Sequence, residues 1–282
     1  MARSLRIIQY GAERVLHSLS VAGGSAHLYW EPLMGALVET EAGWVLLDTG
    51  MSRAAHESDS VTAAYRASGQ RADNPDAAWH LRPAPPSSDD WTWGHGGHPI
   101  EAALSEFRLT LADLALVAIS HMHVDHSGGI PLLTAAGVPV AIQRAELDFV
   151  RSGRVGAADG FFEPDWTEPG TRWWILDGDT RLAPGVQAIS TAGHTPGHMS
   201  FRVDLPETGT WLFAQDAADL GQNVLDRVPC GSYAGRTEAD KSAAGVALER
   251  LFAIAAETDA RLIPGHDQVV LNAIRHPPRG HR

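Results

Sequence analysis

Residues 120–129, SHMHVDHSGG, concentrate side chains that bind metal ions. His121, His123, Asp125 and His126 fall within six positions, after an apolar run and before two glycines. Imidazole and carboxylate groups are ligands of zinc and similar first-row metals. Because side chains alternate along an extended loop, His121, His123 and Asp125 can point to one side, and His126 can reach round from the turn that the glycine pair permits. Four such groups can serve two adjacent ions, with the first two histidines on one ion and Asp125 and His126 on the other.

The remaining ligands of such a centre are expected at the ends of other strands, because bound groups in α/β proteins gather at the carboxyl ends of strands. Three side chains occupy such places: His194 in the turn of STAGHTPGH, Asp216 after TWLFAQ and His266 after ARLIPG. The sequence therefore predicts a dinuclear centre. One ion would be held by His121, His123 and His194, and the other by Asp125, His126 and His266, with Asp216 between them.

Two divalent ions, which we expect to be Zn²⁺, would support hydrolysis of an acyl bond. Zinc lowers the pKa of bound water from 15.7 to roughly 7, so a bridging hydroxide becomes the nucleophile. One of the ions would also polarise the carbonyl oxygen and stabilise the charge that develops on it. We expect two catalytic carboxylates, Asp125 and Asp216, with Asp216 passing the proton of the nucleophile to the leaving group.

Strands and helices must position these side chains, and their order is that of an α/β chain. The N-terminal part predicts an antiparallel meander of strands at 6–10, 26–30, 35–40 and 44–48. The rest alternates helices at 99–109, 129–136, from 144 onward and 238–256 with strands at 114–120, 138–143, 186–190, 199–205, 210–216 and 260–265. We expect one domain over residues 1–282.

Residues 51–98 are interpreted as an insertion in this domain. Their later part is rich in Pro, Ser, Asp and Gly, and it holds Trp91 and Trp93. Long irregular segments inside a domain are often lids or binding loops, so we expect a lid or a subunit contact. An alternative of equal standing is that these tryptophans only pack the loop onto the core. A second irregular stretch, 156–174, adds further aromatic candidates for an apolar substrate pocket: Phe161, Phe162 and Trp166.

Composition narrows the possible partners. The formal net charge is −12, which argues against nucleic acid and favours a neutral substrate. Cys230 is the single cysteine, so an internal disulfide and a thiolate cluster are excluded, and it is expected to be inert. The sequence contains no apolar run of about 18 residues, so it predicts no membrane-spanning helix. The first twenty residues carry no apolar run of signal-peptide length, so we expect a cytoplasmic protein.

The motifs SHMHVDHSGG, AGHTPGH, the strand-end Asp216 and PGHD occur in the order of the metallo-β-lactamase superfamily, which the chain resembles over nearly its whole length. The resemblance implies an αββα sandwich with the site along one edge of its two sheets. It implies that Asp48, in LLDTGM, orients a metal-bound histidine. It also implies that His194, and not His198, is the ligand of the GHTPGH motif.

Within that superfamily the chain is most similar to N-acyl homoserine lactone lactonases, in length, in DTGM followed by a large insertion, and in both histidine motifs. This resemblance implies a neutral lactone or ester as substrate, a quorum-quenching role and a possible homodimer. The sequence departs from the pattern at Asp219, where many lactonases carry a tyrosine. The exact substrate therefore stays open, and Asp219 and Asp226 are expected to be solvated or capping residues.

Three other functions are compatible with the same fold. A glyoxalase II-like thioesterase would share the seven ligands, but it should carry a basic C-terminal patch, and the tail RHPPRGHR is short. An iron-dependent dioxygenase would keep the histidines, although diiron relatives favour glutamate where His123 stands. A binding protein without catalysis is disfavoured because all seven ligands are present. The isolated histidines of the insertion are expected at the surface: His56, His80, His95 and His98.

Overall fold

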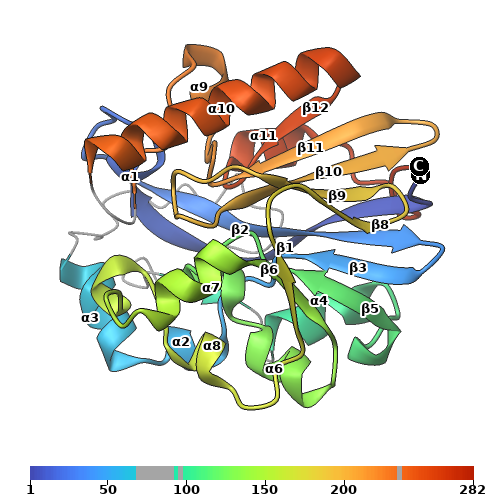
Figure 1. The fold of residues 1–282 in the computed structure, drawn as a ribbon, viewed down its shortest axis with the longest axis horizontal. Coiled ribbons are helices and arrows are strands. Elements are labelled where there is room, and N and C mark those ends of the chain that lie inside the picture. Colours follow the sequence, from blue (N-terminus) through green and yellow to red (C-terminus); the bar gives the residue numbers. More distant parts are fainter. Residues whose placement is uncertain (68–91, 95–97, 234–236) are drawn as a thin grey trace.

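The computed structural model describes residues 1–67, 92–94, 98–233 and 237–282, and residues 92–94 only as backbone. Two β-sheets face each other, and helices cover the outer face of each (Figure 1). This arrangement confirms the expected αββα sandwich. Among the described helices, none combines the length and the apolarity that a membrane span requires.

The first sheet has the strand order β4-β1-β2-β3-β5-β6-β7. β1, β2 and β3 form an antiparallel meander. From β3 onward, the neighbours β3, β5, β6 and β7 pair parallel. Parallel neighbours bring several carboxyl ends to one edge of the sheet, where ligand-binding side chains gather. The strands are β1 (Ser4–Leu16), β2 (Leu28–Thr40), β3 (Gly43–Leu47), β4 (Thr92–Gly94), β5 (Leu114–Ala118), β6 (Val140–Gln143) and β7 (Trp173–Leu176).

The second sheet has the order β12-β11-β10-β9-β8. Its edge pair β11 and β12 is parallel and the other pairs are antiparallel, so β11 and β12 end side by side. The strands are β8 (Thr180–Ala183), β9 (Val186–Ser190), β10 (Met199–Leu205), β11 (Gly209–Gln215) and β12 (Arg261–Pro264).

Helices shield the outer faces of the two sheets. α10 covers the second sheet, and α4, α6 and α7 lie on the side of the first (Figure 1). The helices are α1 (His17–Ser20), α2 (Arg53–His56), α3 (Asp59–Ala67), α4 (Pro99–Glu106), α5 (Val124–Ser127), α6 (Ile130–Ala135), α7 (Arg144–Arg151), α8 (Pro164–Thr167), α9 (Gly221–Asp226), α10 (Glu238–Thr258) and α11 (Gln268–Ala273).

The core follows from the alternation of side chains along each strand. Val45 and Leu47 of β3 pack between the sheets with Phe201 of β10. Leu46, which points to the opposite face, packs against Ile100 of α4. A third cluster seats α10 on the second sheet. The apolar runs of these central strands are therefore buried on both faces.

Two sequence expectations about the N-terminal part were wrong or incomplete. The strands expected at 26–30 and 35–40 are one continuous strand, β2. The segment 51–98 begins with two helices, α2 and α3, and returns as β4 against β1. The rest of that segment, 68–91 and 95–97, lies outside the described residues, so the lid or subunit contact stays a prediction.

The glycine pair after the histidine motif acts differently from the expected turn. Gly128 and Gly129 have ordinary backbone φ values of −58° and −86°. A Cβ on Gly128 would lie 2.1 Å from the backbone nitrogen of Ser52, and one on Gly129 would lie 2.0 Å from Cδ1 of Ile100. These glycines are needed for close packing rather than for a left-handed conformation.

Candidate metal centre

The seven predicted ligands come from one edge of the sandwich. His121 and His123 follow β5, and α5 carries Asp125 and His126. The others follow β9, β11 and β12 respectively: His194, Asp216 and His266. The structure brings all seven together in two groups with the membership that the sequence predicted, because these strands end at the same edge. Asp125 and His126 both lie in a helical turn, whereas Asp125 was expected in an extended loop.

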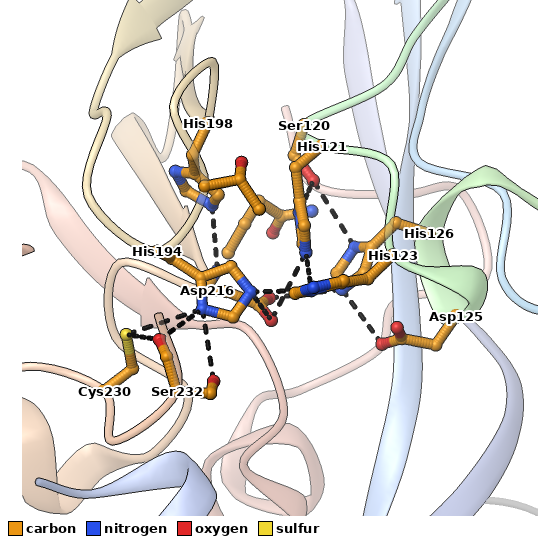
Figure 2. Close-up of polar contacts among 12 residues, drawn as sticks. Ser120, His121, His123, Asp125, His126, His194, His198, Asp216, Cys230 and Ser232 are labelled. Atoms are coloured by element: carbon orange, nitrogen blue, oxygen red, sulfur yellow. Dashed lines mark hydrogen bonds and ion pairs between the residues drawn. The ribbon is translucent and has the colours of Figure 1, made fainter. Parts of the chain in front are cut away.

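Three histidines form the first group. Nδ1 of His123 lies 2.9 Å from Nε2 of His121 and 2.8 Å from Nε2 of His194 (Figure 2). Oδ2 of Asp216 is 3.3 Å from Nε2 of His194 and 3.6 Å from Nε2 of His121. Four donor atoms from three strand ends therefore converge on one point.

The second group is built around His126. Its Nε2 lies 3.0 Å from Oδ2 of Asp125 and 3.2 Å from Nε2 of His266. Oδ1 of Asp216 is 3.1 Å from the Nε2 atoms of both His126 and His266. The two oxygens of Asp216 thus face different groups, as expected of a carboxylate between two ions.

The donor atoms fit zinc. Zn–N bonds of about 2.0–2.1 Å in a tetrahedral site place neighbouring nitrogens roughly 3.3 Å apart. The contacts of 2.8–3.2 Å between ring nitrogens are close to that spacing. Ring nitrogens that face one another as lone pairs repel unless a cation lies between them. The described residues of the two groups therefore suit divalent ions.

Hydrogen bonds behind the cluster orient four of the imidazoles. Nδ1 of His126 donates to Oδ2 of Asp48 at 2.8 Å, and Nδ1 of His121 lies 3.0 Å from Oγ of Ser120. Nδ1 of His194 donates to the Ser232 carbonyl at 3.0 Å, and that of His266 to the Pro32 carbonyl at 3.1 Å. Each bond leaves Nε2 free as a ligand.

Glu146 is a buried group of the site that the sequence did not single out. This α7 residue accepts hydrogen bonds from the backbone nitrogen of Met122 at 2.9 Å and from that of Gly197 at 3.0 Å. Its other donor is Oγ1 of Thr195, at 2.6 Å. Glu146 therefore ties the loop of His121 to the loop of His194. In the sequence, Glu146 only interrupts the apolar face of α7, so the sequence gives no signal for this role.

Burial and charge divide the imidazoles into two kinds. Burial lowers the pKa of His121 and of His194, and it lowers that of His123 to about 3. Burial acts the same way on His126 and His266, but the neighbouring carboxylates, Asp216 among them, raise the pKa of both well above the ordinary value. The imidazoles of the first group are thus neutral, whereas the more basic imidazoles are those beside the carboxylates of the second group.

His198 has a structural environment. It is buried, its Nε2 accepts a hydrogen bond from the backbone nitrogen of Asp216 at 3.1 Å, and its Nδ1 lies 2.9 Å from Oγ1 of Thr191. It belongs to neither ligand group.

The buried Cys230 has its Sγ 3.6 Å from Nδ1 of His194, beside the Ser232 carbonyl (Figure 2).

A cavity of about 660 Å³ opens beside the two groups. His123, Asp125, Asp216 and residues 157–160 contribute to its wall. Asp219 also lines it and is only 4% exposed, so the expectation of a solvated residue was wrong.

The aromatic candidates that the structure describes, Phe161, Phe162 and Trp166, do not line this cavity. Phe161 is buried in the core, with its ring centroid 4.4 Å from that of His123, and neither it nor Phe162 lines the cavity. Trp166 is buried in the same cluster. Trp91 lies outside the described residues, and Trp93 is described only as backbone of β4.

Comparison with known sequences gives one family and a consistent set of relatives. The family model described as the metallo-beta-lactamase superfamily matches residues 89–266. An N-acyl homoserine lactonase of Bacillus cereus is 27% identical over 236 residues, which cover 84% of this chain and 81% of that protein. Another, from Azorhizobium caulinodans, is 30% identical over 162 residues, covering 55% of this chain and 59% of the relative.

Solved structures share the fold over almost the full chain. A quorum-quenching N-acyl homoserine lactone lactonase superposes with a TM-score of 0.76 at 23% identity, covering 99% of this chain and 98% of the other. A dizinc quorum-quenching lactonase superposes with a TM-score of 0.62 at 15% identity, covering 95% of this chain and 89% of the other. At these identities the likeness concerns the fold alone.

Proposed function

Since the chain belongs to the metallo-β-lactamase superfamily, we propose that it is a metal-dependent hydrolase that opens a lactone ring of the N-acyl homoserine lactone class. One observation carries the proposal: the oxygens of Asp216 face two separate ligand groups, 3.1 and 3.3 Å from the nearest ring nitrogens. The relatives named N-acyl homoserine lactonase, aligned over most of the chain, support the substrate class.

We assign the ions as zinc from the nitrogen and oxygen donor set. When bound, two such ions would supply a nucleophile from water at neutral pH and would polarise the substrate carbonyl. The first would be held by His121, His123 and His194, and the second by Asp125, His126 and His266, with Asp216 shared.

The carboxylates of the chain handle protons. Burial favours the neutral form of Asp216, but the surrounding imidazoles, first that of His126, hold its pKa well below the ordinary value. Asp216 therefore enters the reaction as an acceptor, able to take a proton from attacking water and return it to the leaving oxygen. Asp125 lines the cavity beside it and is the second candidate for this transfer.

Asp48 and Glu146 act as positioning residues in this proposal. Asp48 holds one imidazole through Nδ1, and Glu146 ties two ligand loops together. Neither lines the cavity, so neither is assigned a contact with substrate.

The direct test is a pH-drop assay of zinc-loaded protein against matched lactones, thioesters and β-lactams. We expect lactones to be opened with the highest kcat/KM. His121→Ala should abolish turnover while thermal unfolding stays cooperative. His276→Ala, a substitution of an exposed histidine at the C-terminal end, is the matched control and should keep full activity.

Two outcomes would redirect the proposal. Good thioester turnover without lactone turnover would favour the glyoxalase II-like alternative. Iron rather than zinc in protein purified without added metal, together with oxygen consumption, would favour the dioxygenase alternative. The homodimer and the cytoplasmic location remain predictions.

A further inference from the structure

Three buried carboxyl side chains line the cavity without belonging to either ligand group. They are Glu13 of β1, Glu31 of β2 and Asp219, which follows β11. Their exposed fractions are 5%, 3% and 4%. Ionisable groups so deeply buried are costly unless they are paired, so each should have a partner.

Protein groups satisfy only part of this wall. Tyr65 donates a hydrogen bond to Oε2 of Glu13, and Ser20 and Tyr29 both donate to Oε1 of Glu31. Within the described part of the chain, the second oxygen of each glutamate receives no hydrogen bond. Neither oxygen of Asp219 receives one, and its Oδ1 is buried.

A third metal ion does not explain these oxygens. Among the described residues, the groups whose ligand atoms lie within 4.8 Å of one another are the two already assigned, and Glu13, Glu31 and Asp219 are in neither. Acceptors spread over a cavity of about 660 Å³ suit an organic ligand with hydrogen-bond donors.

We propose that Glu13, Glu31 and Asp219 form a carboxyl wall that accepts hydrogen bonds from N–H groups of the substrate. This inference rests on the proposed lactonase function and assigns the residues that would recognise the amide N–H next to the lactone ring. The acceptor role holds whether a carboxyl is ionised or protonated, because both forms offer an oxygen lone pair.

Asp219 gives the cleanest test because its replacement strands no protein donor. Replacing an unpartnered buried polar group by an apolar one of similar shape is close to neutral or stabilising. Asp219→Leu should therefore leave the melting temperature of the zinc-loaded protein unchanged or raise it. Glu31→Met is the second variant, although it removes an acceptor of the Ser20 and Tyr29 hydroxyls.

The experiment compares kcat/KM for N-hexanoyl homoserine lactone with that for the analogue in which CH₂ replaces the amide N–H. One hydrogen bond to a carboxyl predicts a preference for the N–H compound of about tenfold or more. The ratio should fall towards one in Asp219→Leu or Glu31→Met and should be largely kept in Asp219→Asn, which retains an acceptor oxygen. Asp226→Leu, at an exposed position on α9, should keep the ratio of the unchanged protein.

The outcomes separate the wall from the proposed function. A ratio near one in the unchanged protein, or a ratio that neither Asp219→Leu nor Glu31→Met alters, would overturn the wall while lactone turnover still supports the lactonase. If no lactone is opened, calorimetry with the non-hydrolysable γ-lactams of both compounds decides. Tighter binding of the N–H lactam, lost in Asp219→Leu, supports the wall, and equal binding overturns it.

Discussion

Oδ2 of Asp48 lies 2.8 Å from Nδ1 of His126, although 78 positions separate the two residues. The same carboxylate accepts hydrogen bonds from the backbone nitrogen of Ser120 at 2.6 Å and from the side chain of Gln215. Asp48 has a left-handed backbone φ of 57°, which is uncommon for a residue with a side chain. The ends of β3, β5 and β11 are thus joined through one buried acid behind the candidate centre.

Asp48→Asn tests that junction. The amide fits the same space, but it is a weaker acceptor for His126 Nδ1–H, so the imidazole loses orientation and basicity. We expect zinc affinity to fall about 10- to 100-fold, the usual cost of losing such a partner, as measured by competition with a chromophoric chelator. Asp177→Asn, at the exposed end of an ion pair with Arg144, should change nothing. Equal zinc affinities for Asp48→Asn and the unchanged protein would remove Asp48 from this role.

Glu146→Gln tests the tie between the two histidine loops. Three donors now converge on one carboxylate, and an amide would turn its NH₂ towards at least one of them. We expect a loss of unfolding free energy of about 1–3 kcal/mol and weaker binding at the first group. Urea denaturation and zinc titration together measure this. A variant as stable as the unchanged protein would mean that the loops hold without this bond.

His194→Ala and His198→Ala separate ligand from scaffold. His194 contributes Nε2 to the first group, so its loss should cost one of two bound ions and lactone turnover. His198 contacts the backbone nitrogen of Asp216 and the hydroxyl of Thr191, so its loss should lower thermal stability but keep two ions per chain. Elemental analysis after dialysis counts the ions. The reverse pattern would show that the second histidine of GHTPGH is the ligand.

Asp165 predicts a pH dependence of stability. Burial raises its pKa to about 7 from the ordinary 3.8, while a hydrogen bond from Ser127 opposes the shift. Between these values the folded protein holds a proton that the unfolded chain has released, so this contribution to stability falls as the pH rises from about 4 to 7.

Asp165→Asn removes that titration. Its melting temperature relative to the unchanged protein should therefore rise from pH 5 to pH 8, by about 2 °C or more. Differential scanning calorimetry across this range measures the difference, with Asp226→Asn as the exposed control. A difference that stays constant with pH would contradict the raised pKa.

The parts of the fold that sequence predicted well are the strands with unbroken apolar runs. β5, β9 and β10 begin and end close to their expected positions. β1 and β2 were read as too short, because Glu13 and Arg14 interrupt one strand and Glu31 and Pro32 the other. Two of those residues line the cavity, so the pattern broke where a polar group was retained at the site.

The candidate site divides in the same way. The grouping of the seven ligands was predictable because four lie in one short motif and three sit at strand ends. Glu146 and the carboxyl wall were not, since their partners come from loops and strands far away in the sequence. The role of an acidic residue that stands alone in the sequence, such as Glu146, can be assigned only from its contacts in the folded structure.

Metal analysis joined to anomalous diffraction at the zinc edge tests the central claim most directly. Protein loaded with zinc and dialysed should hold two ions per chain, one beside Nδ1 of His123 and one beside Nε2 of His266, with one oxygen of Asp216 directed at each. A single ion, or ions bound away from these side chains, would contradict the account.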